Sequence, residues 1–345
     1  MKKNLIWAML ISPLFLAAQD QGIAFEHNLS WQQVLQKAKT LHKYIFLDCY
    51  ASWCGPCKLM DKEVYANDTV GKRMNAEFIS VKLQMDTTKQ DSQEVQSWYA
   101  TTHAIQRQYS IYAYPSFLFF SPDGQILHKE IGAKDVAKFI ELAKTVIDPQ
   151  QQYYTLLNKY QQGTLGYARM PGLAKTAKKL GEDSIGMKVA GDYIRRWLET
   201  LPEDQLWTKE SVAFVNSWRK LLRYDEKIFQ CYFRDRKQID SLMNIPDYTD
   251  GLINYMVYTQ EITPNINSAL EQNAEPDWKG MEKIVTAKYS SDYVVKNMLK
   301  GRVEFYKSAK EWHNYAKYLV LRGEDAEIIK MPAGIVNFML LDNWA

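Results

Sequence analysis

Hydrophobic and polar positions divide the chain into two halves with different periodicities. In the first half, short apolar runs alternate with segments whose apolar residues recur at helical spacing. The runs predict strands at residues 22–27, 44–50, 77–86, 116–120 and 125–132. The periodic segments predict helices at residues 31–39, 54–64, 95–109 and 135–147. This alternation is typical of an α/β layer fold.

Several of these elements carry more specific signals. Ser30, with Gln33 three residues later, predicts a capping box that opens the first helix. The run "YIFLDCY" (44–50) is apolar on both faces except at Asp48, which favours a central, buried strand. The tetrapeptide "SPDG" (121–124) predicts a turn that joins the last two strands as a hairpin.

Beyond Gln150 the pattern becomes helical, and no further run predicts a strand. Four segments place apolar residues three or four apart: "DYIRRWLETL", "AFVNSWRKLL", "GLINYMVYTQ" and "EWHNYAKYLVL". Breakers follow at Pro202, Pro246 and Pro264. We expect an all-α array of roughly seven to nine helices, stacked in pairs as in a solenoid, without a nameable repeat. The final "IVNFMLLDNWA" stops inside an apolar helix face, which suggests a truncated chain.

The first residues, "MKKNLIWAMLISPLFLAAQD", predict a targeting segment. Two lysines precede an apolar core, and Ala17-Ala18 suit cleavage before Gln19. We therefore expect a signal peptide at residues 1–18; the alternative is an uncleaved membrane anchor. No later segment is apolar and long enough to predict a membrane span. The mature protein is expected to work outside the cytoplasm, in a bacterial periplasm.

Composition and charge narrow the classes of function. A length of 345 residues suits two domains, and 46% hydrophobic with 24% charged residues is ordinary for a globular protein. The net charge of +3 gives no reason to expect nucleic acid or an anionic membrane as a partner. Four cysteines are too few for a disulfide scaffold in a chain of this size.

The pair Cys54-Gly55-Pro56-Cys57 is the main candidate for chemistry, and three interpretations compete. A structural zinc site needs a second pair of ligands, but the five histidines are scattered singly, at positions 27, 42, 103, 128 and 313. A purely structural disulfide usually closes a longer loop, because two intervening residues constrain the unfolded chain little. The third interpretation is a redox-active pair, with no metal and no cofactor beyond the disulfide itself.

Physical chemistry favours the redox interpretation. After a central strand, the pair would open a helix, which places the Cys54 sulfur at the positive end of the helix dipole. Such a position lowers the pKa of a thiol and increases its reactive thiolate form. Cys57, one turn inside the helix, would be shielded and placed to resolve a mixed disulfide. Pro56 is tolerated in the first turn, where a missing N–H costs nothing.

Over about residues 22–149 the chain resembles the thioredoxin family. The segment "WCGPCK", from Trp53 to Lys58, matches the active-site motif of that family residue for residue. Four further positions agree in order, and each corresponds to a family feature: the buried acid at Asp48, its lysine partner at Lys82, the cis-proline at Pro115 and the groove glycine at Gly132. The resemblance implies a thioredoxin fold for residues 19–149, and the helical pattern predicts a separate helical domain at residues 150–345.

The resemblance also implies roles for these residues. Asp48 would have a raised pKa from burial and act as a general base toward Cys57, or would simply be neutralised by Lys82. Pro115 would present a backbone edge to an extended substrate; the alternative is an ordinary turn proline. Trp53 would shield the disulfide, or merely pack. The substrate-binding surface would comprise Trp53, Gly55, Pro56, Tyr114, Pro115 and Gly132.

The chain departs from the family pattern in two places. Tyr114 stands before the proline, where Thr or Ile is usual, and could alter potential or substrate choice. The stretch from Asp86 to Pro115 is longer than in minimal members, and its Trp98-Tyr99 stripe is expected to extend a helix into the core. Longer members of this kind resemble extracytoplasmic thioredoxin-like proteins and the soluble domains of membrane thiol–disulfide interchange proteins.

The other two cysteines have quieter interpretations. Cys49 follows Asp48 on its strand, so it points to the opposite face and is expected to be an inert, buried thiol. Cys231, in "IFQCYFRDR", lies in a predicted helix. Its alternatives are inert packing and an intermolecular disulfide.

The sequence thus predicts a periplasmic thiol–disulfide oxidoreductase that acts as a reductase on protein disulfides. In an oxidising compartment it would need an electron donor in the inner membrane. The competing hypothesis is a partner-binding protein whose thioredoxin domain is a docking platform; an oxidase or isomerase is a weaker variant. The sequence identifies no partner for the helical domain.

Overall fold

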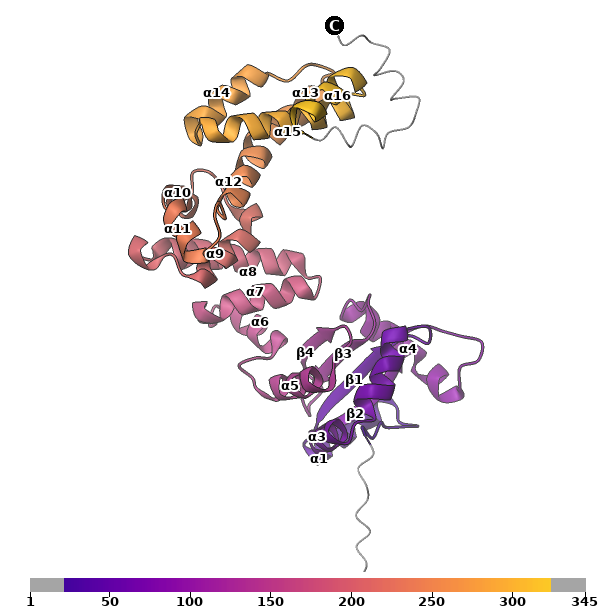
Figure 1. Cartoon of the computed structure of the whole chain (residues 1–345). Helices are drawn as coiled ribbons and strands as arrows, with labels where there is room; N and C mark the ends of the chain where they lie inside the picture. The colour runs from indigo at the N-terminus through magenta and orange to yellow at the C-terminus, as the bar shows by residue number, and fades with distance from the viewer. Residues whose placement is uncertain (1–21, 324–345) are drawn as a thin grey trace, which may run out of the picture. The chain divides into compact units, whose positions relative to one another are not determined.

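A computed structural model describes residues 22–323 of the chain. The expected signal peptide (1–18) and the apolar C-terminal segment (335–345) lie outside these residues. The chain divides into two compact units between Gly186 and Met187. The first unit thus continues beyond residue 149, the predicted end of the first domain, and Figure 1 gives the order of its elements. The predicted boundary itself stays a prediction.

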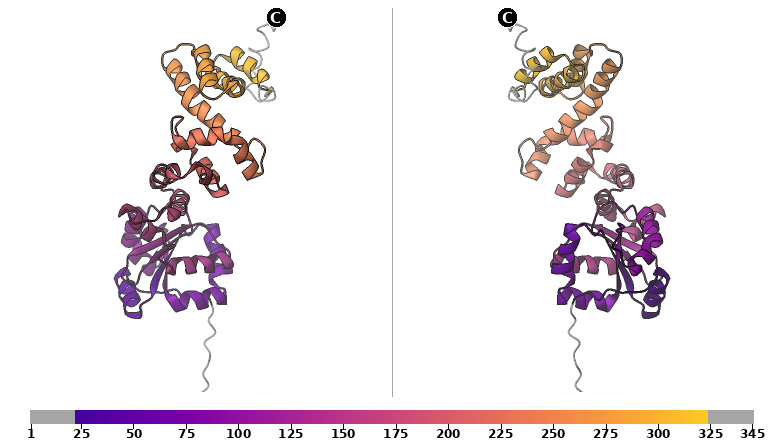
Figure 2. Two further views of the ribbon diagram at one scale, coloured as in Figure 1. Left: turned by 90° about the vertical axis from the view of Figure 1, so that its left-hand side faces the viewer. Right: turned by 90° about the vertical axis from the view of Figure 1, so that its right-hand side faces the viewer.

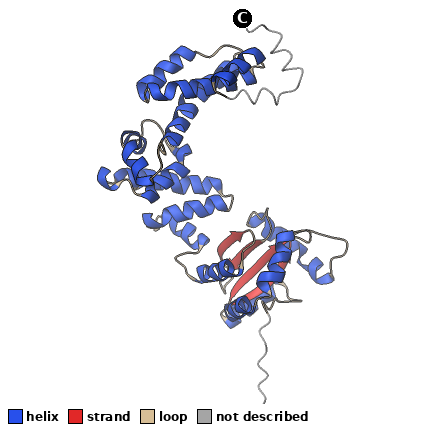
Figure 3. Cartoon of the chain, in the orientation of Figure 1, coloured by secondary structure: helices blue, strands red, loops and turns tan. Residues whose placement is uncertain are grey.

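A four-stranded mixed sheet forms the centre of the first unit, in the order β2-β1-β3-β4. Strand β1 (Tyr44–Tyr50) pairs in parallel with β2 (Phe78–Gln84) and antiparallel with β3 (Ser116–Phe120). The hairpin partner of β3 is β4 (Ile126–Ile131), as expected from the sequence. These are all the strands in the described part of the chain (Figure 3).

The strand predicted at residues 22–27 is reduced to a single bridge between Phe25 and Ser80. The start of this segment packs closely against α3 (Asp68–Glu77): a Cβ atom on Gly71 would meet the carbonyl oxygen of Gly22 at 2.1 Å. Ile23 N–H donates to the carbonyl of Tyr65 rather than to a strand. The prediction of a short strand at residues 22–27 was therefore wrong.

Helices connect and cover these strands. The predicted capping box of Ser30 and Gln33 is present at the start of the first helix. The helices of this region are α1 (Trp31–Leu41), α2 (Gly55–Leu59), the π-helical η1 (Met60–Tyr65), α3 (Asp68–Glu77), α4 (Gln93–Gln108) and α5 (Val136–Ile147). Only α3 was not predicted from the sequence, and it begins after the N-cap Asn67, whose side chain accepts from two backbone N–H groups.

The sheet has an apolar core on each face, with helices outside both (Figure 2). On one face, α3 and α5 pack on a cluster around Phe46, Phe117 and Phe119. On the other, α1 and α4 pack on a cluster that includes Leu47 and Trp98. The buried position of Trp98 confirms that the long α4 segment extends the core. A sheet covered on both faces explains why β1 reads as a continuous apolar run.

From α6 onward the described residues contain eleven α-helices and no strand, which confirms an all-α second half. The helices in the described residues are more numerous than predicted, and several end in 3-10 or π turns. Helices α6 (Tyr153–Gln161) and α7 (Met170–Lys179) belong to the first unit, and α8 (Asp183–Arg196) spans the division.

The remaining helices belong to the second unit. They are α9 (Lys209–Ser217), α10 (Lys227–Arg234), α11 (Arg236–Met243), α12 (Asp250–Met256), α13 (Thr263–Glu271), α14 (Trp278–Lys288), α15 (Val294–Ser308) and α16 (Trp312–Leu321). Pro264, predicted to be a breaker, instead lies in the first turn of α13, where its missing N–H is tolerated. A solenoid arrangement stays a prediction. Within residues 22–323 no helix is both long and apolar enough to cross a bilayer.

Candidate functional site

Cys54 and Cys57 form a disulfide at the start of a helix that follows β1. Cys54 is the N-cap residue of α2, and its sulfur accepts a hydrogen bond from the backbone N–H of Cys57 at 3.1 Å. Pro56 lies in the first turn, as expected. The helical backbone continues from α2 into η1 and ends at Tyr65, so the predicted helix has the right extent but changes to π geometry after Leu59.

Both cysteine residues are only 3% exposed. The sequence led us to expect a shielded Cys57, but nothing in it indicated that Cys54 would be covered to the same degree. Ala51 completes the buried cluster, and the rings of Tyr50 and Tyr114 pack against it. In this disulfide form, the two sulfurs therefore lie beneath aromatic side chains rather than open to solvent.

The loop that precedes β3 brings Tyr114, one of the predicted substrate-binding residues, to the disulfide. The peptide bond between Tyr114 and Pro115 is cis, as predicted. The ring of Tyr114 makes an edge contact with Trp53, with 5.8 Å between ring centroids. Trp53 itself is 70% exposed, so it offers a flat apolar surface beside the disulfide instead of packing in the core.

Gly132 lies next to the same loop. Its N–H donates to the carbonyl of Pro115 at 2.9 Å. Its φ of +88° is a conformation that side-chain-bearing residues rarely adopt, and a Cβ atom there would meet no neighbour within 4 Å. Glycine is therefore required here by the backbone conformation rather than by crowding.

Asp48 lies in the middle of β1 and is 1% exposed. Burial raises the pKa of its carboxyl group to about 7, an effect that the nearby charge of Lys82 partly offsets. One of its oxygens, Oδ1, has no hydrogen-bond partner among the described residues. The structure thus places an acid that titrates near neutral pH on the strand that leads into the Cys54–Cys57 helix.

Lys82 is the neighbour of Asp48 in the β1–β2 register, but its ion pair is with Asp61. The resemblance implied a direct Asp48–Lys82 pair, and the structure corrects this to an action through space. The Lys82 ammonium also lies 4.8 Å from the centroid of the Tyr50 ring. Asp61 was missed in the sequence, although its place one turn after Cys57 on the predicted helix was a usable signal.

Ser52 and Asp86 form a second contact that the sequence did not indicate. The backbone N–H of Ser52 donates to Asp86 Oδ1 at 2.9 Å, and its hydroxyl donates to Oδ2. This contact joins the loop before Trp53 to the residues just after β2. It holds the loop that leads into Cys54 in place. In the sequence, the only indication of this contact was an aspartate at the end of a predicted strand.

The remaining cysteines are buried thiols. Cys49 lies in the core on the opposite face of β1 from the site, and burial raises the pKa of its thiol well above the ordinary value. Cys231 lies in α10, where its sulfur is 3.8 Å from Glu203 Oε1, and burial raises the pKa of this thiol too. Among the described residues, no three His, Cys, Asp or Glu side chains gather in a way that could hold a metal ion.

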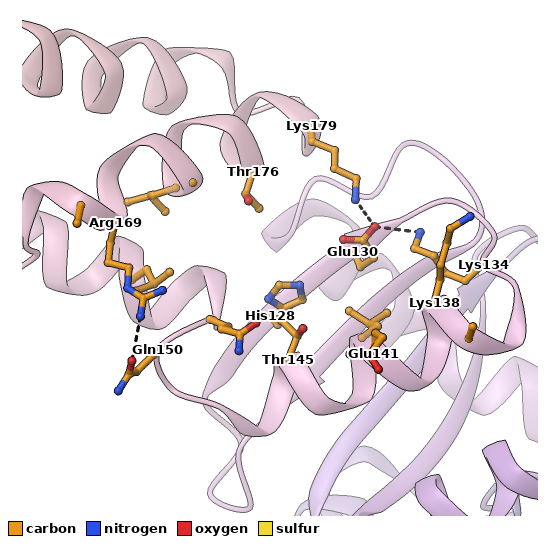
Figure 4. Close-up of a pocket in the computed structure, with 17 residues that line it drawn as sticks. His128, Glu130, Lys134, Lys138, Glu141, Thr145, Gln150, Arg169, Thr176 and Lys179 are labelled. Atoms are coloured by element: carbon orange, nitrogen blue, oxygen red, sulfur yellow. Dashed lines mark hydrogen bonds and ion pairs between the residues drawn. The ribbon is translucent and has the colours of Figure 1, made fainter. Parts of the chain in front are cut away.

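A separate hollow of about 620 Å³ lies among β4, α5 and α7. Figure 4 shows His128 at its centre and Glu130 between the ammonium groups of Lys134 and Lys179. Burial lowers the pKa of His128 to about 4, and its Nδ1 accepts from the N–H of Tyr153. No residue that lines this hollow belongs to the predicted site.

The region that contains this site is similar to several known proteins. A family model described as a thioredoxin-like domain matches residues 31–147. Thioredoxin H1 of Arabidopsis thaliana is 31% identical over 116 residues, which cover 34% of this chain and 85% of that protein. The thiol:disulfide interchange protein DsbD of Campylobacter jejuni (strain RM1221) is 24% identical over 129 residues, which cover 36% of this chain and 21% of that protein.

A solved structure of a thioredoxin from Thermus thermophilus matches with 16% identity and a TM-score of 0.30, covering 36% of this chain and 87% of that one. The region matched by the family model contains the central sheet and the disulfide. The family-model match, the likeness to thioredoxin H1 and the Cys54–Cys57 pair support thiol–disulfide oxidoreductase activity. Because the match to thioredoxin H1 has 31% identity and covers 85% of that protein, the chain belongs to the thioredoxin family.

Proposed function

We propose that the protein reduces disulfide bonds of protein substrates outside the cytoplasm. In its dithiol form, the Cys54 thiolate attacks one sulfur of a substrate disulfide; a mixed disulfide forms, and the other substrate sulfur leaves as a thiolate and takes up a proton. Cys57 then loses its proton and attacks Cys54. The second substrate thiol is released, and two electrons have passed to the substrate.

Asp48 is the proposed acceptor of the Cys57 proton. With a pKa near 7, its carboxylate is a base of useful strength at neutral pH. The observation that carries the proposal is the arrangement of these groups: a disulfide at a helix N-terminus, the cis-Pro115 loop packed beside it, and a buried acid on the preceding strand. No cofactor beyond the Cys54–Cys57 pair is needed for these steps.

The direction of electron flow is inferred from the residues between the cysteines. Gly55-Pro56 matches the dipeptide of thioredoxin, whose potential is about −270 mV, rather than an oxidant near about −120 mV. A reductant in an oxidising compartment must be recharged, so we infer an electron donor in the inner membrane. The lysine-led apolar start of the chain supports the location, and the likeness to DsbD, a thiol:disulfide interchange protein, supports recharging by thiol–disulfide exchange.

Insulin reduction is the direct test. The wild-type chain is expected to catalyse it, and Cys54→Ser is expected to abolish catalysis because the attacking thiolate is lost. Equal rates for the two would refute enzymatic activity and leave the docking-platform hypothesis. Cys57→Ala should trap mixed disulfides on Cys54, and mass spectrometry then identifies the substrates.

The reduction potential separates a reductase from the oxidase or isomerase alternative. Equilibration of the Cys54–Cys57 pair with glutathione buffers gives this potential. A value well below about −200 mV supports the reductase, because glutaredoxins and stronger reductants lie there. A value above about −150 mV would move the protein into the oxidant class.

A further inference from the structure

The connection between α7 and α8 touches the loop that carries the cis-proline. The hydroxyl of Tyr112, three residues before Pro115, donates to the carbonyl of Leu180 at 2.7 Å. Gly181 has a φ of +76°, and a Cβ atom on it would lie 2.0 Å from the Tyr112 hydroxyl oxygen. The two segments can approach this closely only because residue 181 has no side chain.

A buried lysine strengthens the same contact region. Lys129 on β4 is fully buried and donates to the carbonyls of Tyr109 (2.7 Å) and Ser110 (3.3 Å), at the end of α4. Its ammonium lies 5.7 Å from the centroid of the Tyr112 ring. The charge of Glu182, in the α7–α8 connection, acts on this ammonium. Lys129 thus binds the start of the loop through two backbone carbonyls, and Glu182 in the α7–α8 connection carries the opposite charge.

The α7–α8 connection is itself fixed to the sheet. Lys179, at the end of α7, forms an ion pair with the buried Glu130 of β4, which also pairs with Lys134 at 2.9 Å (Figure 4). On its other side, Glu182 accepts a hydrogen bond from the buried Tyr153 hydroxyl of α6. Leu180 and Gly181 are therefore held between two anchored side chains and can act as a rigid support.

The far end of the loop lies against the disulfide. Only Ala113 separates Tyr112 from Tyr114, whose ring packs on the cysteine cluster. The loop is short and internally bonded, since Ser116 donates through its hydroxyl to the carbonyl of Ala113 at 2.7 Å. A displacement of Tyr112 is therefore transmitted to the backbone edge beside Cys54.

We propose that Tyr112 is a positioning residue, through which the α7–α8 connection sets the cis-Pro115 loop for the binding of protein substrates. The helical segment after the thioredoxin fold thus contributes to substrate binding by holding this loop in place. This inference rests on the proposed function and adds a specificity determinant to it. Small disulfides need only the sulfurs, so their turnover is independent of Tyr112, whereas an extended protein chain must pair with the loop.

A pair of glycine variants in the full chain tests this. Gly181→Ala forces the Tyr112 side chain away from Leu180. Gly163→Ala is its matched control, because Gly163 has a similar φ of +71° but a Cβ atom on it would meet no neighbour within 4 Å. Tyr112→Phe removes the hydroxyl alone, and Tyr112 is 60% exposed, so this variant should fold. Gly181→Ala and Tyr112→Phe are expected to raise KM for insulin reduction at least about threefold, with kcat on a small aromatic disulfide unchanged.

Hydrogen exchange provides a readout that does not depend on activity. Loop amides at residues 111–114 should exchange faster in Gly181→Ala and Tyr112→Phe than in the wild type and Gly163→Ala. Unchanged KM and unchanged exchange in both variants would overturn the inference. An inactive wild type with faster loop exchange in the variants would instead refute the proposed function and leave the loop support intact.

Discussion

Asp48 and Lys82 are direct neighbours across the β1–β2 pair, yet the Lys82 ammonium pairs with Asp61 on the helix that follows the disulfide. Lys82 consequently stabilises the ionised Asp48 only through space. Burial remains the larger effect, and the pKa of Asp48 stays near 7. Asp48 can therefore exchange a proton at neutral pH, and its ionisation lowers the stability of the folded protein.

The first prediction concerns Asp48→Asn and stability. Because the folded-state pKa of about 7 exceeds the unfolded value near 3.8, the native state holds its proton more tightly, and stability is lost as pH rises from about 4 through 7. The variant lacks this loss. We expect it to match the wild type near pH 4 and to be more stable at pH 8 by up to about 4 kcal/mol. Urea unfolding at both pH values measures this; a difference independent of pH would contradict it.

A second prediction uses the two charges near Asp48 in opposite directions. Lys82→Met removes a charge that lowers the pKa of Asp48, so that pKa should rise. Asp61→Asn removes a charge that raises it, so the pKa should fall. The pH profile of insulin reduction reports these shifts as displaced midpoints. Displacement of both midpoints in the same direction would exclude Asp48 as the titrating base.

The elements that surround the site were largely predictable, because their apolar patterns are local. The strand at 44–50 and its buried Asp48 follow from one uninterrupted apolar run, and the helix after Cys54 follows from the cysteine motif. Helix α3 was missed because only Val70, Gly71 and Met74 of its residues are buried, too few for a visible periodicity. Its N-cap Asn67 was the available signal.

The charge pairing of the site was less accessible. The π turns of η1 change the direction in which Asp61 projects, and a sequence pattern does not distinguish π from α geometry. The Lys82–Asp61 pair therefore depends on backbone geometry that only the structure provides. Likewise, the contact of Tyr112 with Leu180 joins residues far apart in sequence, for which no local pattern exists.

A third prediction addresses Tyr114, the departure from the family pattern. Its ring packs on the cysteine cluster and on Trp53. Tyr114→Thr removes this cover, so dithiothreitol should reduce the Cys54–Cys57 disulfide a few fold faster. Stopped-flow tryptophan fluorescence, to which Trp53 beside the disulfide contributes, follows the reaction. The unfolding midpoint of the variant, measured alongside, ensures that the folded protein is compared, and an unchanged rate would show that Tyr114 does not limit access.

The last prediction concerns acid stability and His128, which joins β4 to the start of α6. Burial lowers the pKa of this imidazole to about 4 from 6.5, so the unfolded chain binds its proton more readily than the folded one. Stability due to His128 is full above about pH 6.5 and is lost as pH falls through 4, opposite in sign to the effect of Asp48. His128→Gln, which keeps an acceptor for the Tyr153 N–H, should therefore lose less stability between about pH 7 and 4.5, by about 2–3 kcal/mol. Urea unfolding of both proteins at these two pH values provides the comparison. Equal losses would mean that His128 is solvated and titrates normally in the folded protein.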